Sequence, residues 1–200
     1  MLPEEIKAYV KARQFFHCQT NLNTIFSWKE LEKLLNLRQF MRTSRFKFFQ
    51  NDQYYNWDMD YWTRDPECPT IEVIETIIQN SFCLIYECNR VNQHIANICK
   101  DLDEITHGTA DAHLFFTVNP KYQGLGAHTD SMDVMIVQIE GISEIELEHY
   151  GRLRTNPGDV LFIPKKTEHN FISMGPRLSI SFPILEEIST VNRNWISLKI

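Results

Sequence analysis

The sequence lacks the features that would place the chain in a membrane, among disulfide-rich secreted proteins, or on nucleic acid. No apolar run approaches the roughly 20 residues of a membrane-spanning helix, and the N-terminus has no apolar signal-peptide core. The five cysteines are odd in number and form no CxxC pair, which indicates reduced thiols in a cytoplasmic protein. The net charge of −6 disfavours a nucleic-acid or anionic-membrane partner.

Internal repeats, low-complexity tracts and a domain linker are also absent. A chain of 200 residues suits one domain, able to bury roughly 70% of its unfolded surface. We therefore expect a single domain over residues 1–200, with a mixed helical and strand part at 1–107, a β-rich core at 108–183 and a tail at 184–200. The tail is apolar at Trp195, Ile196, Leu198 and Ile200, which suits an interface, so a homodimer is the assembly to test.

Apolar periodicity predicts helices before residue 107 and strands after it. Helices are expected over 3–16, 27–35, 70–78 and 90–106, the second opened by a capping box from Ser27 to Glu30. Early strands are expected over 45–49 and 81–87. The aromatic stretch 54–62 reads as a loop packed on the outside of the fold, the alternative being a wall over a substrate.

From residue 112 onward, strands follow one another at short intervals. They are expected near 112–118, 133–140, 143–149, 159–164 and 177–183, with turn residues between them. This rhythm is typical of a jelly roll or barrel. The predicted fold class is therefore mainly β with N-terminal helices.

The stretch from Gly124 to Gly141 carries the most chemistry. His128 and Asp130 are two residues apart, so on an extended strand both side chains face the same way. A histidine and a carboxylate are two of the three ligands of a facial triad, which holds Fe(II) and leaves positions open. A distant histidine should supply the third, and His113, His149 and His169 compete for the role.

The surroundings of His169 favour that residue. A turn at 156–159, a short apolar strand and a proline stop at Pro164 lead directly to it. The spacing of Gly158, Pro164 and His169 resembles the second signature motif of the cupins. Lys166 stands where glycine is usual, and Ser173 where asparagine is.

Taken together, the two stretches look like the cupin-type JmjC hydroxylases, with the ribosomal oxygenases as the nearest likeness, over residues 108–183. The resemblance implies a double-stranded β-helix that binds Fe(II), 2-oxoglutarate and O2. It further implies that His128, Asp130 and His169 hold the metal and form the catalytic centre.

The co-substrate position departs from the family pattern. Relatives usually place a lysine or arginine fifteen residues after the first metal histidine, but Ser143 stands here, and a hydroxyl does not neutralise a carboxylate. Arg177 is the best substitute, because alternation puts it on one face with Ser179. This pair is similar to the Arg-x-Ser of other 2-oxoglutarate oxygenases. The alternative is a surface arginine at a strand start.

Weaker candidates for the pocket precede the metal stretch. Thr117, Asn119 and Tyr122 are chosen because they lie on the presumed inner side. His113 reads as a satisfied pocket or core histidine, and His149 as part of a solvated acidic face. Zinc competes with iron for the same ligands.

The function expected from the sequence is an Fe(II)- and 2-oxoglutarate-dependent oxygenase. It would hydroxylate a C–H bond of a protein, peptide, amino acid or small biosynthetic substrate. One alternative is a metal-dependent cupin oxidase, dioxygenase or isomerase that does not use 2-oxoglutarate. The third is a non-catalytic jelly-roll binding module whose histidines are structural.

Overall fold

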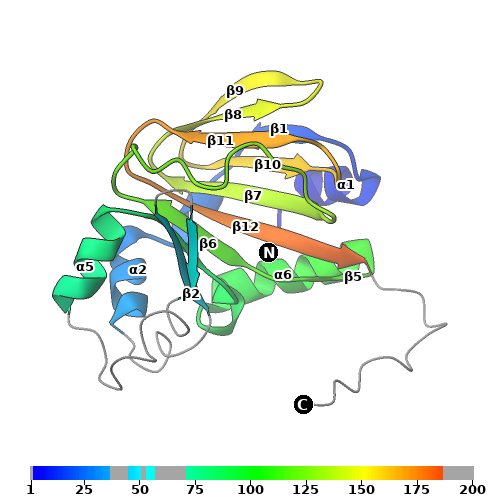
Figure 1. The fold of residues 1–200 in the computed structure, drawn as a ribbon. Coiled ribbons are helices and arrows are strands. Elements are labelled where there is room, and N and C mark those ends of the chain that lie inside the picture. The colour runs from blue at the N-terminus through cyan, green and yellow to red at the C-terminus, as the bar shows by residue number, and fades with distance from the viewer. Residues whose placement is uncertain (1, 37–44, 51–52, 57–70, 187–200) are drawn as a thin grey trace, which may run out of the picture.

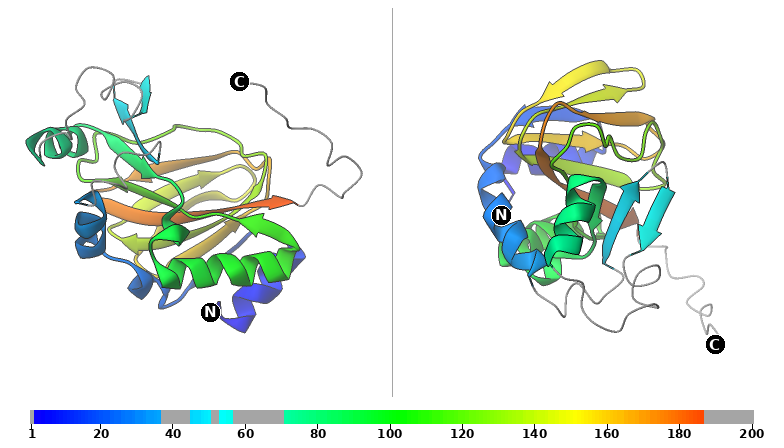
Figure 2. Two further views of the ribbon diagram at one scale, coloured as in Figure 1. Left: turned by 90° about the horizontal axis from the view of Figure 1, so that it is seen from below. Right: turned by 60° about the vertical axis from the view of Figure 1, so that its left-hand side comes forward.

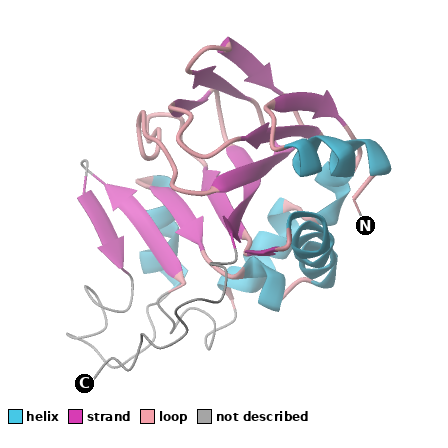
Figure 3. Cartoon of the chain, turned by 90° about the vertical axis from the view of Figure 1, so that its right-hand side faces the viewer, coloured by secondary structure: helices cyan, strands magenta, loops and turns pink. Residues whose placement is uncertain are grey.

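Two antiparallel sheets lie face to face in the computed structural model, which describes residues 2–36, 45–50, 53–56 and 71–186 (Figure 1). Helices cover the outer side of the larger sheet, and Figure 3 shows them outside the space between the sheets. This arrangement is the double-stranded β-helix, or jelly roll, predicted from the sequence. The predicted aromatic loop is wrong at its start, because Gln53–Asn56 form a strand that pairs with Phe46–Gln50. Its remainder beyond residue 56 and the tail at 187–200 lie outside the described residues.

The helices and the short 3-10 turns are α1 (Glu4–Ala12), η1 (Leu22–Ile25), α2 (Trp28–Leu35), α5 (Ile71–Gln79), η2 (Cys88–Arg90) and α6 (Gln93–Thr106). The strands are β1 (Phe16–Gln19), β2 (Phe46–Gln50), β3 (Gln53–Asn56), β4 (Phe82–Ile85), β5 (Gly108–Ala110), β6 (His113–Thr117), β7 (Asp133–Glu140), β8 (Ser143–Leu147), β9 (Gly151–Thr155), β10 (Asp159–Ile163), β11 (His169–Ser173) and β12 (Arg177–Glu186).

The larger sheet has nine strands in the order β1-β10-β7-β12-β6-β4-β2-β3, with β5 pairing β12, and the smaller has the order β11-β8-β9. The two sheets meet at an isolated antiparallel bridge between His128 and His169. Strand β12 runs through the middle of the larger sheet, paired with β7 on one side and β6 on the other. Residues on its inner face therefore look into the space between the sheets.

Two apolar clusters hold the layers together. The inner cluster joins the sheets through Val134 and Ile136 of β7, Leu161 and Ile163 of β10, and Ile145 and Leu147 of β8. The outer, larger cluster joins the other face of the large sheet to the helices, and Figure 2 shows α6 lying across that face. Each fully buried Leu, Ile or Phe contributes about 1.5–3 kcal/mol, so the clusters fix how the strands face each other.

Three of the four helices start within one residue of the predicted position, whereas the helix expected from residue 90 starts at Gln93, after the 3-10 turn η2. Ser27 caps α2, since its hydroxyl oxygen accepts the amide of Glu30 at 3.3 Å, which confirms the predicted N-cap. The Glu30 carboxylate returns to the Ser27 hydroxyl at 3.0 Å rather than to its backbone amide, so the box is a side-chain variant. Asn92 caps α6 through the amides of His94 and Ile95. Among the described residues, no helix is long and apolar enough to cross a bilayer.

The end of the first helix is a correction. The predicted helix over 3–16 stops at Ala12, because Arg13 adopts φ 51° in the left-handed region. Phe16 instead begins β1, which pairs with β10, and its ring stacks on Phe162 at a centroid distance of 5.9 Å. Pairing with an existing strand outweighs the local helical periodicity here.

Several short strands were not expected separately: β1, β3, β5, β9 and β11. Strand β9 shows why, since its exposed residues carry no alternating apolar pattern. The strand expected over 143–149 ends at Leu147, because His149 has φ 69° in a turn.

The cysteines fit the expectation of packed, reduced thiols. The four that the structure describes are free, and Cys83, Cys88 and Cys99 are buried. Burial raises the pKa of each of these three thiols, so they are poor nucleophiles.

The turn between β7 and β8 gives a test of the fold. Gly141 has φ 74°, and a Cβ there would lie 2.9 Å from the Cα of Arg177 and closer still to the carbonyl oxygen of Pro176. We expect Gly141→Ala to lower the free energy of unfolding in urea by about 3 kcal/mol or more, since it adds a backbone clash to the left-handed strain.

Gly151 is the matched control, with φ 76° and nothing within 4 Å of an added Cβ. Gly151→Ala should cost only the strain, about 1–2 kcal/mol. Equal losses in the two variants would contradict the close approach of Gly141 to the Pro176–Arg177 backbone.

Candidate metal centre

The bridge between the two sheets brings the predicted ligands together. The amide of His128 donates to the carbonyl of His169 at 3.0 Å, and the amide of His169 donates back at 2.9 Å. His128 lies in the segment before β7, Asp130 follows two residues later, and His169 begins β11. A closed pair of backbone hydrogen bonds therefore sets the spacing of the two histidines.

Both imidazoles are oriented by backbone carbonyls. The Nδ1 atom of His128 lies 2.8 Å from the carbonyl oxygen of Gly126, and that of His169 lies 3.0 Å from the carbonyl oxygen of Thr167. A carbonyl only accepts, so each Nδ1 carries a proton, and in the neutral imidazole it is Nε2 that has the lone pair. This tautomer is the one that a metal-binding histidine needs.

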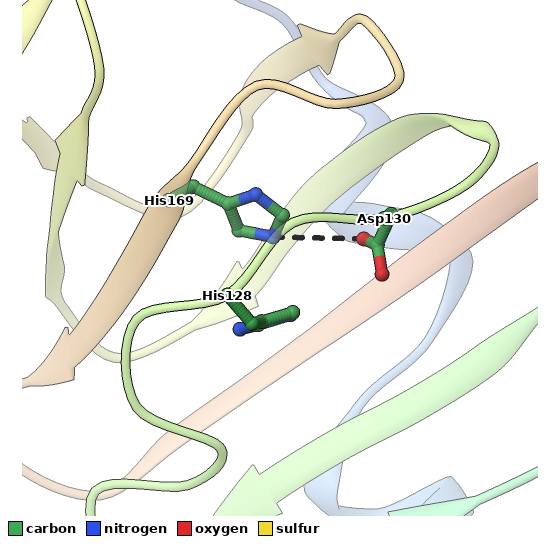
Figure 4. A group of neighbouring side chains, drawn as sticks. All are labelled: His128, Asp130 and His169. Carbon is green, nitrogen blue, oxygen red and sulfur yellow. Dashed lines mark ion pairs between the residues drawn. The ribbon is translucent and has the colours of Figure 1, made fainter.

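The three ligand atoms converge on one point. One atom each from His128, Asp130 and His169 lie within 4.8 Å of one another, and the Asp130 carboxylate lies 3.6 Å from Nε2 of His169 (Figure 4). Burial lowers the pKa of His169, and the neighbouring His128 adds to the shift. The neutral, ligating form of His169 is therefore favoured at neutral pH.

This donor set fits a divalent metal. Two imidazole nitrogens and one carboxylate oxygen match the facial triad of non-haem Fe(II) sites, and zinc accepts the same donors. All three residues line one cavity of about 350 Å³. A metal here would keep open positions toward that cavity.

Arg177 lines the same cavity. Its side chain is 2% exposed, and among the described residues neither Nε nor Nη1 has a hydrogen-bond partner. Burial lowers the pKa of Arg177 to about 10, which leaves the guanidinium charged at neutral pH. The sequence alternative of a surface arginine is therefore wrong.

Two aromatic rings flank this cation. The guanidinium carbon lies 5.4 Å from the ring centroid of Phe82 and 5.2 Å from that of Phe171. The rings stabilise the charge but accept no N–H in the plane of the fork. Sequence reasoning missed both, although Phe171 follows His169 at the two-residue spacing of an inward-facing strand position.

The remaining residues predicted to bind 2-oxoglutarate divide into two groups. Ser179 lines the cavity beside Arg177, whereas Leu178 belongs to the outer core, as alternation predicts. Thr117, Asn119 and Tyr122 do not line it. The Thr117 hydroxyl bonds the carbonyl of Asn119 at 2.9 Å, and Tyr122 lines a neighbouring cleft instead.

Ser143 is closed off from the cavity. Its buried hydroxyl donates to Oε1 of Gln138 at 3.1 Å and lies 2.7 Å from the Thr155 hydroxyl. The position where relatives carry a basic residue is thus a satisfied neutral network. Arg177 is the cation among the residues that line the cavity.

The other histidines follow their expected readings. His113 lines the cavity with Nε2 3.3 Å from the Asp111 carboxylate and its ring edge-on to Tyr86, so it is a satisfied pocket histidine. His149 is exposed beside Glu148, on the solvated acidic face. Neither belongs to the cluster of three ligands.

Comparisons with known proteins bear on the fold. No family model matches the sequence, and no curated protein matches it. Among solved structures, the chain is similar to the ribosomal oxygenase YcfD from Escherichia coli, with 16% identity and a TM-score of 0.63 over 92% of this chain and 52% of that one.

Two further structures of the same protein agree. YcfD with cobalt and 2-oxoglutarate gives 17% identity and a TM-score of 0.60, covering 86% of this chain and 48% of that chain. YcfD with cobalt and succinic acid gives 19% and 0.57, covering 80% and 43%. This chain spans about half the length of YcfD. The resemblance to ribosomal oxygenases is thus confirmed at the level of the fold.

Proposed function

We propose that the protein is an Fe(II)- and 2-oxoglutarate-dependent oxygenase that hydroxylates a C–H bond. One observation carries the proposal: a buried, charged arginine lines the same cavity as a His-Asp-His cluster, and its Nε and Nη1 have no hydrogen-bond partner in the part of the chain that the structure describes. An uncompensated buried cation is costly, so its presence argues for an anionic ligand.

2-Oxoglutarate fits these two features at its two ends. Its 2-oxo acid end chelates a divalent metal, which His128, Asp130 and His169 would hold. Its far carboxylate is an anion that the Arg177 fork binds in a planar, two-point manner. The Ser179 hydroxyl, on the same face of β12, is placed to donate a further hydrogen bond.

The overall reaction balances without another reductant. One oxygen atom of O2 enters the new hydroxyl group, the other enters succinate, and the first carbon of 2-oxoglutarate leaves as CO2. When bound, the iron supplies the activation of O2. The chain orients the co-substrate and surrounds it with apolar walls such as Phe115, Val134 and Ile136, which limit access of water.

The comparison structures support the choice of co-substrate. YcfD binds cobalt and 2-oxoglutarate in one structure, and cobalt and succinic acid in another. Because this chain spans about half of that protein, its substrate is proposed more broadly as a protein, peptide, amino acid or small biosynthetic molecule. The free thiols fit a cytoplasmic site of action, with no nucleic-acid or membrane partner proposed.

Ser143 favours a second candidate. Its closed network lacks the basic residue usual in relatives, as expected for a metal-dependent cupin oxidase, dioxygenase or isomerase that does not use 2-oxoglutarate. A non-catalytic jelly-roll module is the third candidate, and it requires a protein that binds no metal.

The metal centre is tested by removing its ligands. We expect His169→Ala and Asp130→Ala each to weaken Co(II) binding at least 100-fold, because each removes one of three donors. The same variants should release no succinate from 2-oxoglutarate with Fe(II) and ascorbate. Isothermal titration calorimetry and a succinate assay measure the two effects.

His149→Ala is the matched control, since this exposed imidazole is not in the ligand cluster. It should keep the Co(II) affinity of the wild type. Retention of tight Co(II) binding by His169→Ala would contradict the assigned centre, and a wild type that binds no metal would favour the non-catalytic module.

Arg177 is tested by an apolar replacement of similar length. Arg177→Met should abolish 2-oxoglutarate binding to the Co(II)-loaded protein, because the far carboxylate loses its cation. It should also raise the free energy of unfolding of the metal-free protein by roughly 1–2 kcal/mol, since it removes an unpaired buried charge. Calorimetry and urea unfolding measure the two.

Arg177→Lys is the companion variant. It keeps the charge but loses the planar fork, so 2-oxoglutarate should bind at least tenfold more weakly than to the wild type. If Arg177→Met binds 2-oxoglutarate normally, the co-substrate is held elsewhere. If it keeps metal-dependent activity without 2-oxoglutarate, the second candidate function is favoured.

A further inference from the structure

A four-residue turn from Pro164 to Thr167 joins β10 to the strand that begins with His169. The amide of Thr167 donates to the carbonyl of Pro164 at 3.2 Å, which closes the turn. Lys166 has φ 66°, in the left-handed region that glycine tolerates better. The carbonyl of Thr167 then orients the His169 ring. The conformation of this turn thus determines where the His169 ligand atom points.

Two consecutive amides of the turn bind the segment that carries Asp130. The amide of Lys165 donates to Oδ1 of Asp133 at 2.9 Å, and the amide of Lys166 donates to the backbone carbonyl of Asp130 at 2.8 Å. One hydrogen bond is therefore made by the backbone of a ligand residue, and the other by the Asp133 side chain. Together they tie the turn that precedes His169 to the segment that carries Asp130.

The Asp133 side chain is buried and has a partner on each carboxylate oxygen. Asp133 begins β7, its side chain is 4% exposed, and its second oxygen lies 3.2 Å from Nη1 of Arg13. Arg13 also binds Glu186 at 2.5 Å, and Glu186 pairs with Nζ of Lys165 at 2.8 Å. A buried carboxylate with one hydrogen bond on each oxygen is held firmly. Removing it would leave the Lys165 amide and Arg13 without their shared acceptor.

Asp133 is neither a ligand nor a cavity residue. The cluster of ligand atoms consists of His128, Asp130 and His169, and Asp133 does not line the cavity. Its hydrogen bond from the Lys165 amide links it to the metal centre through the turn. The His128–His169 backbone bridge fixes the strand, but it does not fix the ring of His169, which takes its orientation from Thr167.

We propose that Asp133 is a positioning residue of the metal centre. Its carboxylate holds the Pro164–Thr167 turn so that His169 and Asp130 present their ligand atoms at metal-binding separation. The inference rests on the metal centre proposed above. Outer partners of this kind typically change metal affinity 10- to 100-fold when they are removed.

The test uses the full chain and Co(II) alone as the probe. Asp133→Ala removes both hydrogen bonds, and we expect it to weaken Co(II) binding 10- to 100-fold and to alter the visible Co(II) spectrum. Asp133→Asn keeps the shape and one acceptor oxygen, so the loss should be about three- to tenfold. Calorimetry gives the affinities, and near-ultraviolet circular dichroism confirms that each variant is folded.

Glu186→Gln is the matched control. It weakens the ion pairs of Arg13 and Lys165 at the surface but leaves the bond from the Lys165 amide to Asp133. Its Co(II) affinity and spectrum should stay within twofold of the wild type, even where its thermal stability falls. This separates a loss of stability from a loss of metal geometry.

The outcomes distinguish the inference from the function on which it rests. If the wild type binds Co(II) and folded Asp133→Ala binds it within twofold as tightly, the positioning role is overturned and the metal centre stands. If Asp133→Ala does not fold, Asp133→Asn decides by the same criterion. If the wild type binds no Co(II), the metal centre fails, and the role of Asp133 fails with it.

Discussion

The pair of backbone hydrogen bonds between His128 and His169 is the constraint on which the site depends. It joins the smaller sheet to the larger one at the point where the chain enters β7. Each of its residues also carries a ligand atom, so one contact both closes the barrel and sets the distance between two imidazoles. The carbonyls of Gly126 and Thr167 then fix both tautomers. A change that breaks this bridge would therefore disturb both the contact between the sheets and the position of two candidate ligands.

The inner face of β12 gives the cavity its positive charge, through Arg177. Its outward residues, such as Leu178 and Ile180, belong to the helix-covered core, whereas Arg177 and Ser179 look inward. A jelly roll with purely apolar inner walls would be more stable, because a buried guanidinium without a carboxylate is unfavourable. The flanking rings of Phe82 and Phe171 offset part of that cost. An anionic ligand bound to Arg177 would offset the remaining free-energy cost of this buried charge.

Much of this arrangement could be predicted from the sequence, because it follows from local rules. The two-residue spacing of His128 and Asp130 puts both side chains on one face, and strand alternation does the same for Arg177 and Ser179. The turn, short strand and proline before His169, which resemble a cupin motif, indicate the third ligand. Alternation could not place Thr117 correctly, since its hydroxyl turns to the carbonyl of Asn119.

What the sequence could not reveal depends on contacts between distant segments. The pairing of Asp133 with Arg13 spans the whole N-terminal half, and the left-handed residues Arg13 and Lys166 carry no local signal. The departure at Lys166 from the usual cupin glycine was visible, but its consequence was not. Only the fold shows that the amide of Lys166 donates to the carbonyl of Asp130.

The most direct test of the central claim is an anaerobic titration of 2-oxoglutarate into the Fe(II)-loaded wild-type protein, followed by visible absorption. A 2-oxo acid that chelates Fe(II) gives a metal-to-ligand charge-transfer band. The account predicts a band that saturates at one 2-oxoglutarate per chain. A protein that holds Fe(II) at the triad and yet shows no band at any 2-oxoglutarate concentration would contradict it.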